Sequence, residues 1–130
     1  MGRTKDIFMD VQQQHAEDIG EYNFQLKSYH MKQELFNQYV VSTAENFGVD
    51  EDDLFSKTKK REVVDARQML YYACSKRPMR VTFIQECMAE NGYYVGHSVI
   101  LYGIKSMGKK IDEDQDYHVI LEKIQNCITT

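Results

Sequence analysis

The sequence contains little of what sheets, disulfide scaffolds or membrane spans require. Its 130 residues include one proline, Pro78, and seven glycines, and no segment alternates cleanly between polar and apolar residues. This pattern predicts an almost entirely helical chain. No apolar run is long enough to cross a bilayer, and no signal-peptide core follows Met1. We therefore expect a soluble protein of the cytoplasm with no membrane partner.

Cysteine and histidine are also few. The three cysteines and four histidines are widely separated, so the sequence has neither the paired spacing of a zinc site nor the dense pattern of a disulfide framework. We expect reduced, mostly buried thiols and no bound metal. The sequence has no glycine-rich phosphate loop, no paired-carboxylate arrangement and no Ser/His/Asp order. We therefore expect no catalytic residue, no cofactor and no enzymatic activity.

Positive charge is scarce overall but concentrated in one part of the chain. The formal net charge of −4 argues against a nucleic-acid-binding protein. Residues 56–110, however, carry 11 basic and 4 acidic side chains, whereas residues 1–55 carry 4 and 11, and residues 111–130 carry 1 and 5. A basic centre between two acidic segments is typical of a protein that presents one face to phosphate.

The densest group of cations precedes a predicted helix. Lys57, Lys59, Lys60 and Arg61 fall within five positions, directly after Ser56. A solvated charge run and a polyanion-binding loop are both consistent with such a group when it is considered alone. The segments that follow it favour the second interpretation.

The helical patterns predict two parts of the chain. Residues 1–30 have sparse apolar positions after a candidate capping residue, Thr4, and predict either a poorly ordered arm or an element for self-association or partner docking. Residues 31–130 predict one compact helical domain. Its first helix has apolar residues at helical spacing from Phe36 onward and stops at Gly48.

A helix-turn-helix is predicted in the second half of this domain. Thr82-Phe-Ile-Gln85 matches a capping box that opens a short helix, Asn91-Gly92 ends it, and a second helix begins at His97. The first residues of the second helix in such a motif contact base edges in the major groove. His97, Ser98 and Val99 are therefore candidate base contacts. His97 and Ser98 are equally suited to capping or beginning their own helix, and the pattern leaves both roles open.

Two motifs and one flanking segment carry a family resemblance. They are Ser56-Lys-Thr-Lys-Lys-Arg-Glu-Val-Val-Asp-Ala-Arg-Gln-Met69, Gly96-His-Ser-Val-Ile-Leu-Tyr-Gly-Ile-Lys105 and Gly48-Val-Asp-Glu-Asp-Asp-Leu54. Together they resemble the DNA-binding domain of the bacterial replication initiator DnaA. The resemblance implies an all-α, Trp-repressor-like helix-turn-helix bundle that binds double-stranded DNA, here with an extra amino-terminal helical arm.

The same resemblance implies a role for nine residues. It places Lys59 in the minor groove, Lys105 near the DNA backbone, and base contacts at the start of the helix that begins at His97. The other basic residues would contact phosphate or support such contacts, and for Arg67 an intrahelical salt bridge with Glu62 is an open alternative. The DNA-binding candidates are Lys57, Lys59, Lys60, Arg61, Arg67, His97, Ser98, Val99 and Lys105.

The chain departs from the family pattern just before the second helix. Gly96 replaces an acidic residue that can accept a hydrogen bond from cytosine, and Tyr93-Tyr94-Val95 replaces a glycine-rich, arginine-bearing turn. The two tyrosines are suited to packing against the next helix or to lying against DNA. The ATPase module of the family has no counterpart in these residues, so we expect a stand-alone version encoded by a phage or mobile element.

Three functions follow as hypotheses. The first is a non-enzymatic DNA-binding protein in replication initiation or transcriptional control. The second is a phage virion or DNA-packaging protein, similar to a small terminase, that retains the helix-turn-helix and forms a homo-oligomer through the amino-terminal arm. The third is an adaptor whose acidic amino-terminal part engages a basic protein partner. The 11 cations of residues 56–110 argue against the third.

Overall fold

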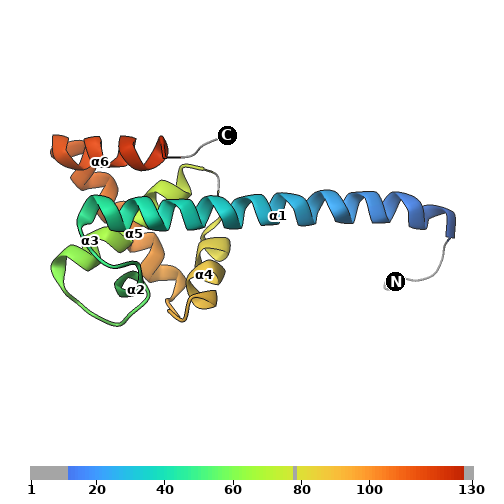
Figure 1. Ribbon diagram of the computed structural model, residues 1–130, viewed down its shortest axis with the longest axis horizontal. Helices are drawn as coiled ribbons and strands as arrows, with labels where there is room; N and C mark the ends of the chain where they lie inside the picture. Colours follow the sequence, from blue (N-terminus) through green and yellow to red (C-terminus); the bar gives the residue numbers. More distant parts are fainter. Residues whose placement is uncertain (1–11, 78, 128–130) are drawn as a thin grey trace. The chain divides into compact units, whose positions relative to one another are not determined.

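The computed structural model describes residues 12–77 and 79–127, and all regular secondary structure in this part of the chain is helical. The helices, in chain order, are α1 (Gln12–Phe47), α2 (Glu51–Leu54), α3 (Arg61–Ser75), α4 (Val81–Glu90), α5 (His97–Glu113) and α6 (Gln115–Gln125). The predicted all-α class with a helix-turn-helix is confirmed (Figure 1).

The chain divides into two compact units, residues 1–33 and residues 34–130. The boundary falls inside α1, a single helix of 36 residues. The sequence predicts two separate helices in this region. They are joined because no proline interrupts them, and an interior glycine such as Gly20 costs a helix only about 1 kcal/mol. Thr4, the predicted cap of the first helix, lies outside the described residues.

The carboxyl-terminal part of α1 supplies one side of the core of the second unit. Phe36 and Ala44 are buried there, as their spacing predicts. The predicted glycine stop is also confirmed, because Gly48 has a φ of 66° and the next amide, Val49 N–H, donates to the Ala44 carbonyl at 3.0 Å. Val41 of the same helix is 41% exposed.

Helix α3 occupies the centre of the second unit, where it contacts α2, α4, α5 and α6. Its approach to α5 depends on a small residue at the crossing. A Cβ atom at Gly103 would lie 3.0 Å from Tyr71 Cδ2 and 3.3 Å from Gln68 Cγ. Glycine at this position therefore fixes how closely the second helix of the helix-turn-helix lies against α3.

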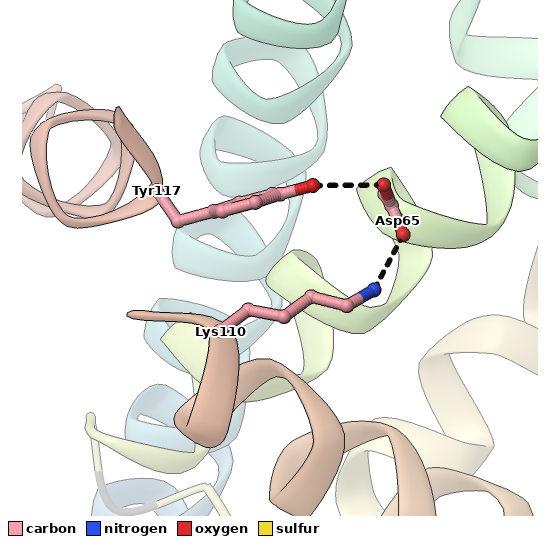
Figure 2. A network of polar contacts seen from close by, with 3 residues as sticks. All are labelled: Asp65, Lys110 and Tyr117. Carbon is pink, nitrogen blue, oxygen red and sulfur yellow. Dashed lines mark hydrogen bonds and ion pairs between the residues drawn. The ribbon is translucent and has the colours of Figure 1, made fainter. Parts of the chain in front are cut away.

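A carboxylate joins three helices at the other end of this packing. Lys110 Nζ of α5 lies 2.8 Å from Asp65 Oδ1 of α3, and the Tyr117 hydroxyl of α6 donates to Asp65 Oδ2 at 3.0 Å (Figure 2). Burial, and then the hydrogen bond to Asp65, raise the pKa of Tyr117, so the phenol stays protonated as the donor. We call Asp65, Lys110 and Tyr117 the Asp65 network.

The thiols are packed as small apolar groups. Cys74 and Cys87 are buried free cysteines, and Cys127 is a partly buried one. Burial raises the pKa of Cys74 well above its ordinary value and that of Cys87 to about 12, so both thiols stay protonated. Within residues 12–77 and 79–127, no helix is long and apolar enough to be a membrane span, and no group of three or more metal-ligating side chains is present.

Candidate nucleic-acid interface

The basic loop, residues 56–60, connects α2 to α3 and carries its cations on the outside. Lys57, Lys59 and Lys60 are exposed, and so is Arg61, the first residue of α3. The four cations predicted as one group therefore all face solvent. None of them is engaged in an ion pair within the described part of the chain.

Two hydroxyl groups shape the backbone of this loop. Ser56 Oγ donates to the Asp53 carbonyl at 2.9 Å and accepts from Thr58 N–H at 3.4 Å, and Thr58 Oγ1 accepts from Lys60 N–H at 3.3 Å. Ser and Thr commonly hold a backbone amide two residues later in this way. The alternating residues thus divide into hydroxyls that shape the backbone and lysines that are exposed, and this alternation is visible in the sequence.

Arg67 of α3 binds the backbone of the loop from the interior of the domain. Its side chain is only 6% exposed. Its Nε donates to the Leu54 carbonyl at 2.9 Å, and its Nη2 donates to the carbonyls of Asp53 at 3.2 Å, of Thr58 at 3.0 Å and of Ser56. The guanidinium therefore draws the backbone from the end of α2 to the middle of the basic loop around one buried charge.

Arg67 also reaches the turn of the helix-turn-helix. Its guanidinium carbon lies 4.8 Å from the centroid of the Tyr93 ring, within cation–π range. The alternative of a salt bridge with Glu62 is not formed, because Glu62 is exposed and the hydrogen bonds of Arg67 go to backbone carbonyls. Arg67 was predicted either to contact phosphate itself or to support the phosphate contacts of other residues. Because the side chain is buried, it is suited to the supporting role.

The helix-turn-helix consists of α4, the turn of residues 91–96, and α5. Gly92 has a φ of 93°, a conformation that favours glycine, and Val95 is buried beneath the turn. Gln85 Nε2 donates to the Val95 carbonyl at 2.9 Å and so ties the turn to α4. The predicted capping box is therefore wrong: α4 begins at Val81 without a side-chain cap, and Thr82 is exposed within the helix.

The two tyrosines of the turn have different environments. Tyr93 is partly buried against the Arg67 guanidinium, so it takes the packing role of the two proposed for it. Tyr94 is 85% exposed and is free of such packing. Adjacent identical residues thus divide between the interior and the surface, a difference that the sequence alone does not distinguish.

The predicted base contacts all lie on the surface at the start of α5. His97, Ser98 and Val99 are exposed, and the side chains of His97 and Ser98 form no hydrogen bond within the described part of the chain. The N-cap residue, Gly96, likewise provides no side-chain cap. His97 and Ser98 therefore do not cap α5, and their contact with bases remains a prediction.

The exposed face of α5 extends beyond the predicted residues. Ser98, Tyr102, Lys105 and Lys109 are exposed at helical spacing, opposite the buried residues of the same helix. Tyr102 is 67% exposed and its neighbour Leu101 is 48% exposed. The helical period could have identified them, because Tyr102 and Lys109 each lie four residues after a predicted contact, Ser98 and Lys105.

Comparison with known proteins relates the chain to replication initiators. No protein-family model matches the chain. It is 27% identical over 88 residues to the chromosomal replication initiator protein DnaA of Nautilia profundicola, covering 65% of this chain and 19% of that protein. It is 22% identical over 127 residues to the protein of the same name from Sulfurimonas denitrificans, covering 95% of this chain and 27% of that protein. The chain thus spans about a quarter or less of these relatives, and its similarity to DnaA is weak but extends over most of its own length.

Proposed function

We propose that the chain is a non-enzymatic protein that binds double-stranded DNA and prefers particular base sequences. The observation that carries this proposal is the joint support of two surfaces by Arg67, which binds the backbone of the basic loop and packs on Tyr93 in the turn before α5. One buried side chain therefore relates the exposed cations to the exposed start of α5. The similarity to proteins named as replication initiators supports DNA as the partner and replication initiation as the process.

In this proposal the two surfaces have separate tasks. Lys59 enters the minor groove, and the neighbouring cations of the loop contact phosphates. His97, Ser98 and Val99 meet base edges in the major groove, and Lys105 contacts the DNA backbone. Helices α3 and α5 both begin without a side-chain cap, so their first amides are free to donate to phosphate oxygens as well.

On the resemblance of the motifs, we further propose that the bundle is of the Trp-repressor-like type and that a phage or mobile element encodes it. Transcriptional control is the second process that such a domain would serve. If the chain is instead a DNA-packaging oligomer, its mass in solution, measured over a range of concentrations by light scattering, will exceed that of one chain. A monomer at every concentration would exclude that alternative.

A gel-shift series at increasing salt tests the proposal. Neutralising about five or six phosphates predicts a slope of log affinity against log salt near −5. Replacing both Lys59 and Arg61 by Ala should weaken binding to all duplexes alike and reduce the slope by roughly 2. Lys123→Ala, an exposed lysine of α6, is the matched control and should leave the slope unchanged. Absence of binding at low salt, or a slope that the loop substitutions do not alter, would refute the proposal.

A further inference from the structure

The start of α5 and the turn before it lack the side chains that most often distinguish bases. Between Gly92 and Ile104 the sequence contains no Arg, Lys, Asp, Glu, Asn or Gln. Arg and Lys read guanine, Asn and Gln read adenine, and acidic residues accept from cytosine. The polar groups there are His97, Ser98 and the hydroxyls of three tyrosines, of which Tyr94 and Tyr102 are exposed, so hydrogen bonding can specify few base pairs.

Apolar side chains occupy this surface instead. Val99 is 53% exposed, Leu101 48% and Tyr102 67%, all within the first two turns of α5. Isolated exposed apolar residues are ordinary, but here three lie within four positions of one helix, where Tyr102 is one turn from Val99 and next to Leu101. We call Val99, Leu101 and Tyr102 the apolar patch.

Cations flank the apolar patch on its own helix and beside it. Lys105 and Lys109 continue the exposed face of α5 toward its carboxyl end. Arg67, through its contact with Tyr93, holds the basic loop against the turn that precedes the patch. Such a surface is complementary to a ligand with a charged backbone and an apolar group recessed between its phosphates. In the major groove that group is the 5-methyl of thymine.

We propose that the apolar patch reads thymine methyl groups, so that the chain selects duplexes in which thymines line the major groove opposite α5. Leu101 and Tyr102 make these contacts at the outer face of the helix, and Val99 makes them at its flank. This inference rests on the proposed function and deepens it, because it names the class of DNA that the same surface selects.

Duplexes that differ only in a major-groove methyl group test this inference. The full chain is titrated by fluorescence anisotropy against alternating A·T and alternating A·U duplexes of about two helical turns. A second pair compares inosine·cytosine with inosine·5-methylcytosine, which adds the methyl group without adding thymine. Each methyl that the patch contacts should strengthen binding on the order of fourfold in both pairs, as expected for burial of one apolar carbon.

Substitutions connect the effect to the patch. The double variant Leu101→Ala, Tyr102→Ala should bring the A·T to A·U affinity ratio close to one while changing affinity for the A·U duplex little. Val119→Ala on α6, another exposed apolar residue, should leave the ratio as in the unchanged chain. Thermal unfolding of each variant verifies that these surface changes leave the fold intact.

The outcomes separate this inference from the proposed function. Equal affinity for A·T and A·U, together with a salt slope that the Lys59 and Arg61 substitutions still reduce, would overturn methyl reading and keep DNA binding. No binding to any of the four duplexes at low salt would overturn both. If the double variant dissociates a self-associated chain without changing the affinity ratio, the patch is a contact between copies and the inference is wrong.

Discussion

The basic loop and the exposed start of α5 differ in the side chains that they present to solvent, which are charged in the loop and largely apolar in α5. The basic loop and Arg61, the first residue of α3, expose four cations in five positions, whereas the hydroxyl groups that shape the loop are half-buried. The first two turns of α5 expose the apolar patch and the side chains of His97 and Ser98, and no formally charged residue precedes Lys105 in this helix. Charge interacts with any phosphate backbone, whereas shape and apolar contact depend on the base. In the proposed function, the loop therefore supplies affinity and α5 supplies selectivity.

The two surfaces nonetheless share one support. Arg67 binds four carbonyls at and before the loop and packs on Tyr93 in the turn before α5. Gly103 and the Asp65 network then set how α5 lies on α3. Selectivity and affinity can therefore be disturbed together through the interior or separately at the surface.

Removing the shared support should have the largest effect. Arg67→Ala deletes a charged donor to four carbonyls, and we expect the free energy of unfolding to fall by about 3 kcal/mol, since one hydrogen bond to a charged group contributes about 1.5–3 kcal/mol. Urea unfolding measures this change. DNA binding should weaken as well, because the loop is no longer held to α3.

Matched substitutions define what Arg67 contributes. Arg77→Ala removes an exposed cation beyond the end of α3 and should change stability by less than about 0.5 kcal/mol. Arg67→Lys keeps the charge but lacks the planar fork, so it should recover only part of the loss. Full recovery with lysine would contradict the account of a guanidinium that binds several carbonyls at once.

A methyl group at the crossing of α3 and α5 should have the next largest effect. Gly103→Ala places a Cβ atom 3.0 Å from Tyr71 Cδ2, so the Tyr71 side chain must shift, which costs roughly 1–3 kcal/mol and exceeds the about 1 kcal/mol that alanine adds to a helix interior. Gly96→Ala is the control, because no atom lies within 4 Å of a Cβ there. Thermal unfolding compares the two. A Gly103→Ala variant that is more stable than the unchanged chain, by the roughly 1 kcal/mol of helix propensity alone, would show that the helices do not approach as closely as described.

Loss of one hydrogen bond in the Asp65 network should have a smaller effect. Tyr117→Phe removes the donor to Asp65 Oδ2 and should lower stability by about 1 kcal/mol. Tyr39→Phe is its control, because the buried Tyr39 hydroxyl has no partner among the described residues. We expect that variant to unfold at neutral pH with nearly unchanged free energy. A larger loss for Tyr39→Phe than for Tyr117→Phe would contradict this assignment.

Tyr39 should also affect the free energy of unfolding at alkaline pH. Burial raises its pKa from 10.0 to about 12 in the folded chain. The folded state therefore holds this proton more tightly than the unfolded state, and stability should fall as pH rises from 10 toward 12. Tyr39→Phe removes this contribution, so its stability should fall less over that range. Identical pH profiles of the two proteins would contradict a buried, neutral phenol.

The smallest expected change in stability is at the start of α5. Asp is a better N-cap residue than Gly by a few tenths of a kcal/mol, so Gly96→Asp should stabilise the chain by about that amount. Its effect on DNA would be more informative. The new carboxylate can accept from cytosine, so selection from a random duplex pool should enrich cytosine at one position compared with the unchanged chain.

Periodic apolar positions predicted much of the fold. The spacing from Phe36 to Gly48 correctly located the buried end of α1, and Asn91-Gly92 followed by His97 correctly located the turn and the start of α5. The exposed basic loop was also located, because its charges and the hydrophobic Leu54 that anchors it are adjacent in sequence. Patterns of this kind depend only on local spacing, which a sequence contains directly.

The polar interior could not be predicted in the same way. Gln85 satisfies a carbonyl ten residues away rather than the amide of Thr82, and Arg67 binds carbonyls 9 to 14 residues before it. Asp65 meets partners 45 and 52 residues later. The hydrogen-bond partner of a side chain depends on which groups lie near it in the folded chain. Sequence patterns indicate only partners that are close in sequence, whereas the partners in the structure are distant in sequence.

One paired titration tests the division between the two surfaces most directly. Affinity for the A·T and A·U duplexes is measured as a function of salt for the unchanged chain, for the Lys59→Ala, Arg61→Ala variant and for the Leu101→Ala, Tyr102→Ala variant. We predict that the first variant reduces the salt slope by roughly 2 and keeps the A·T to A·U ratio. The second should keep the slope and lose the ratio. A loop variant that loses the ratio, or an α5 variant that loses the slope, would contradict the account.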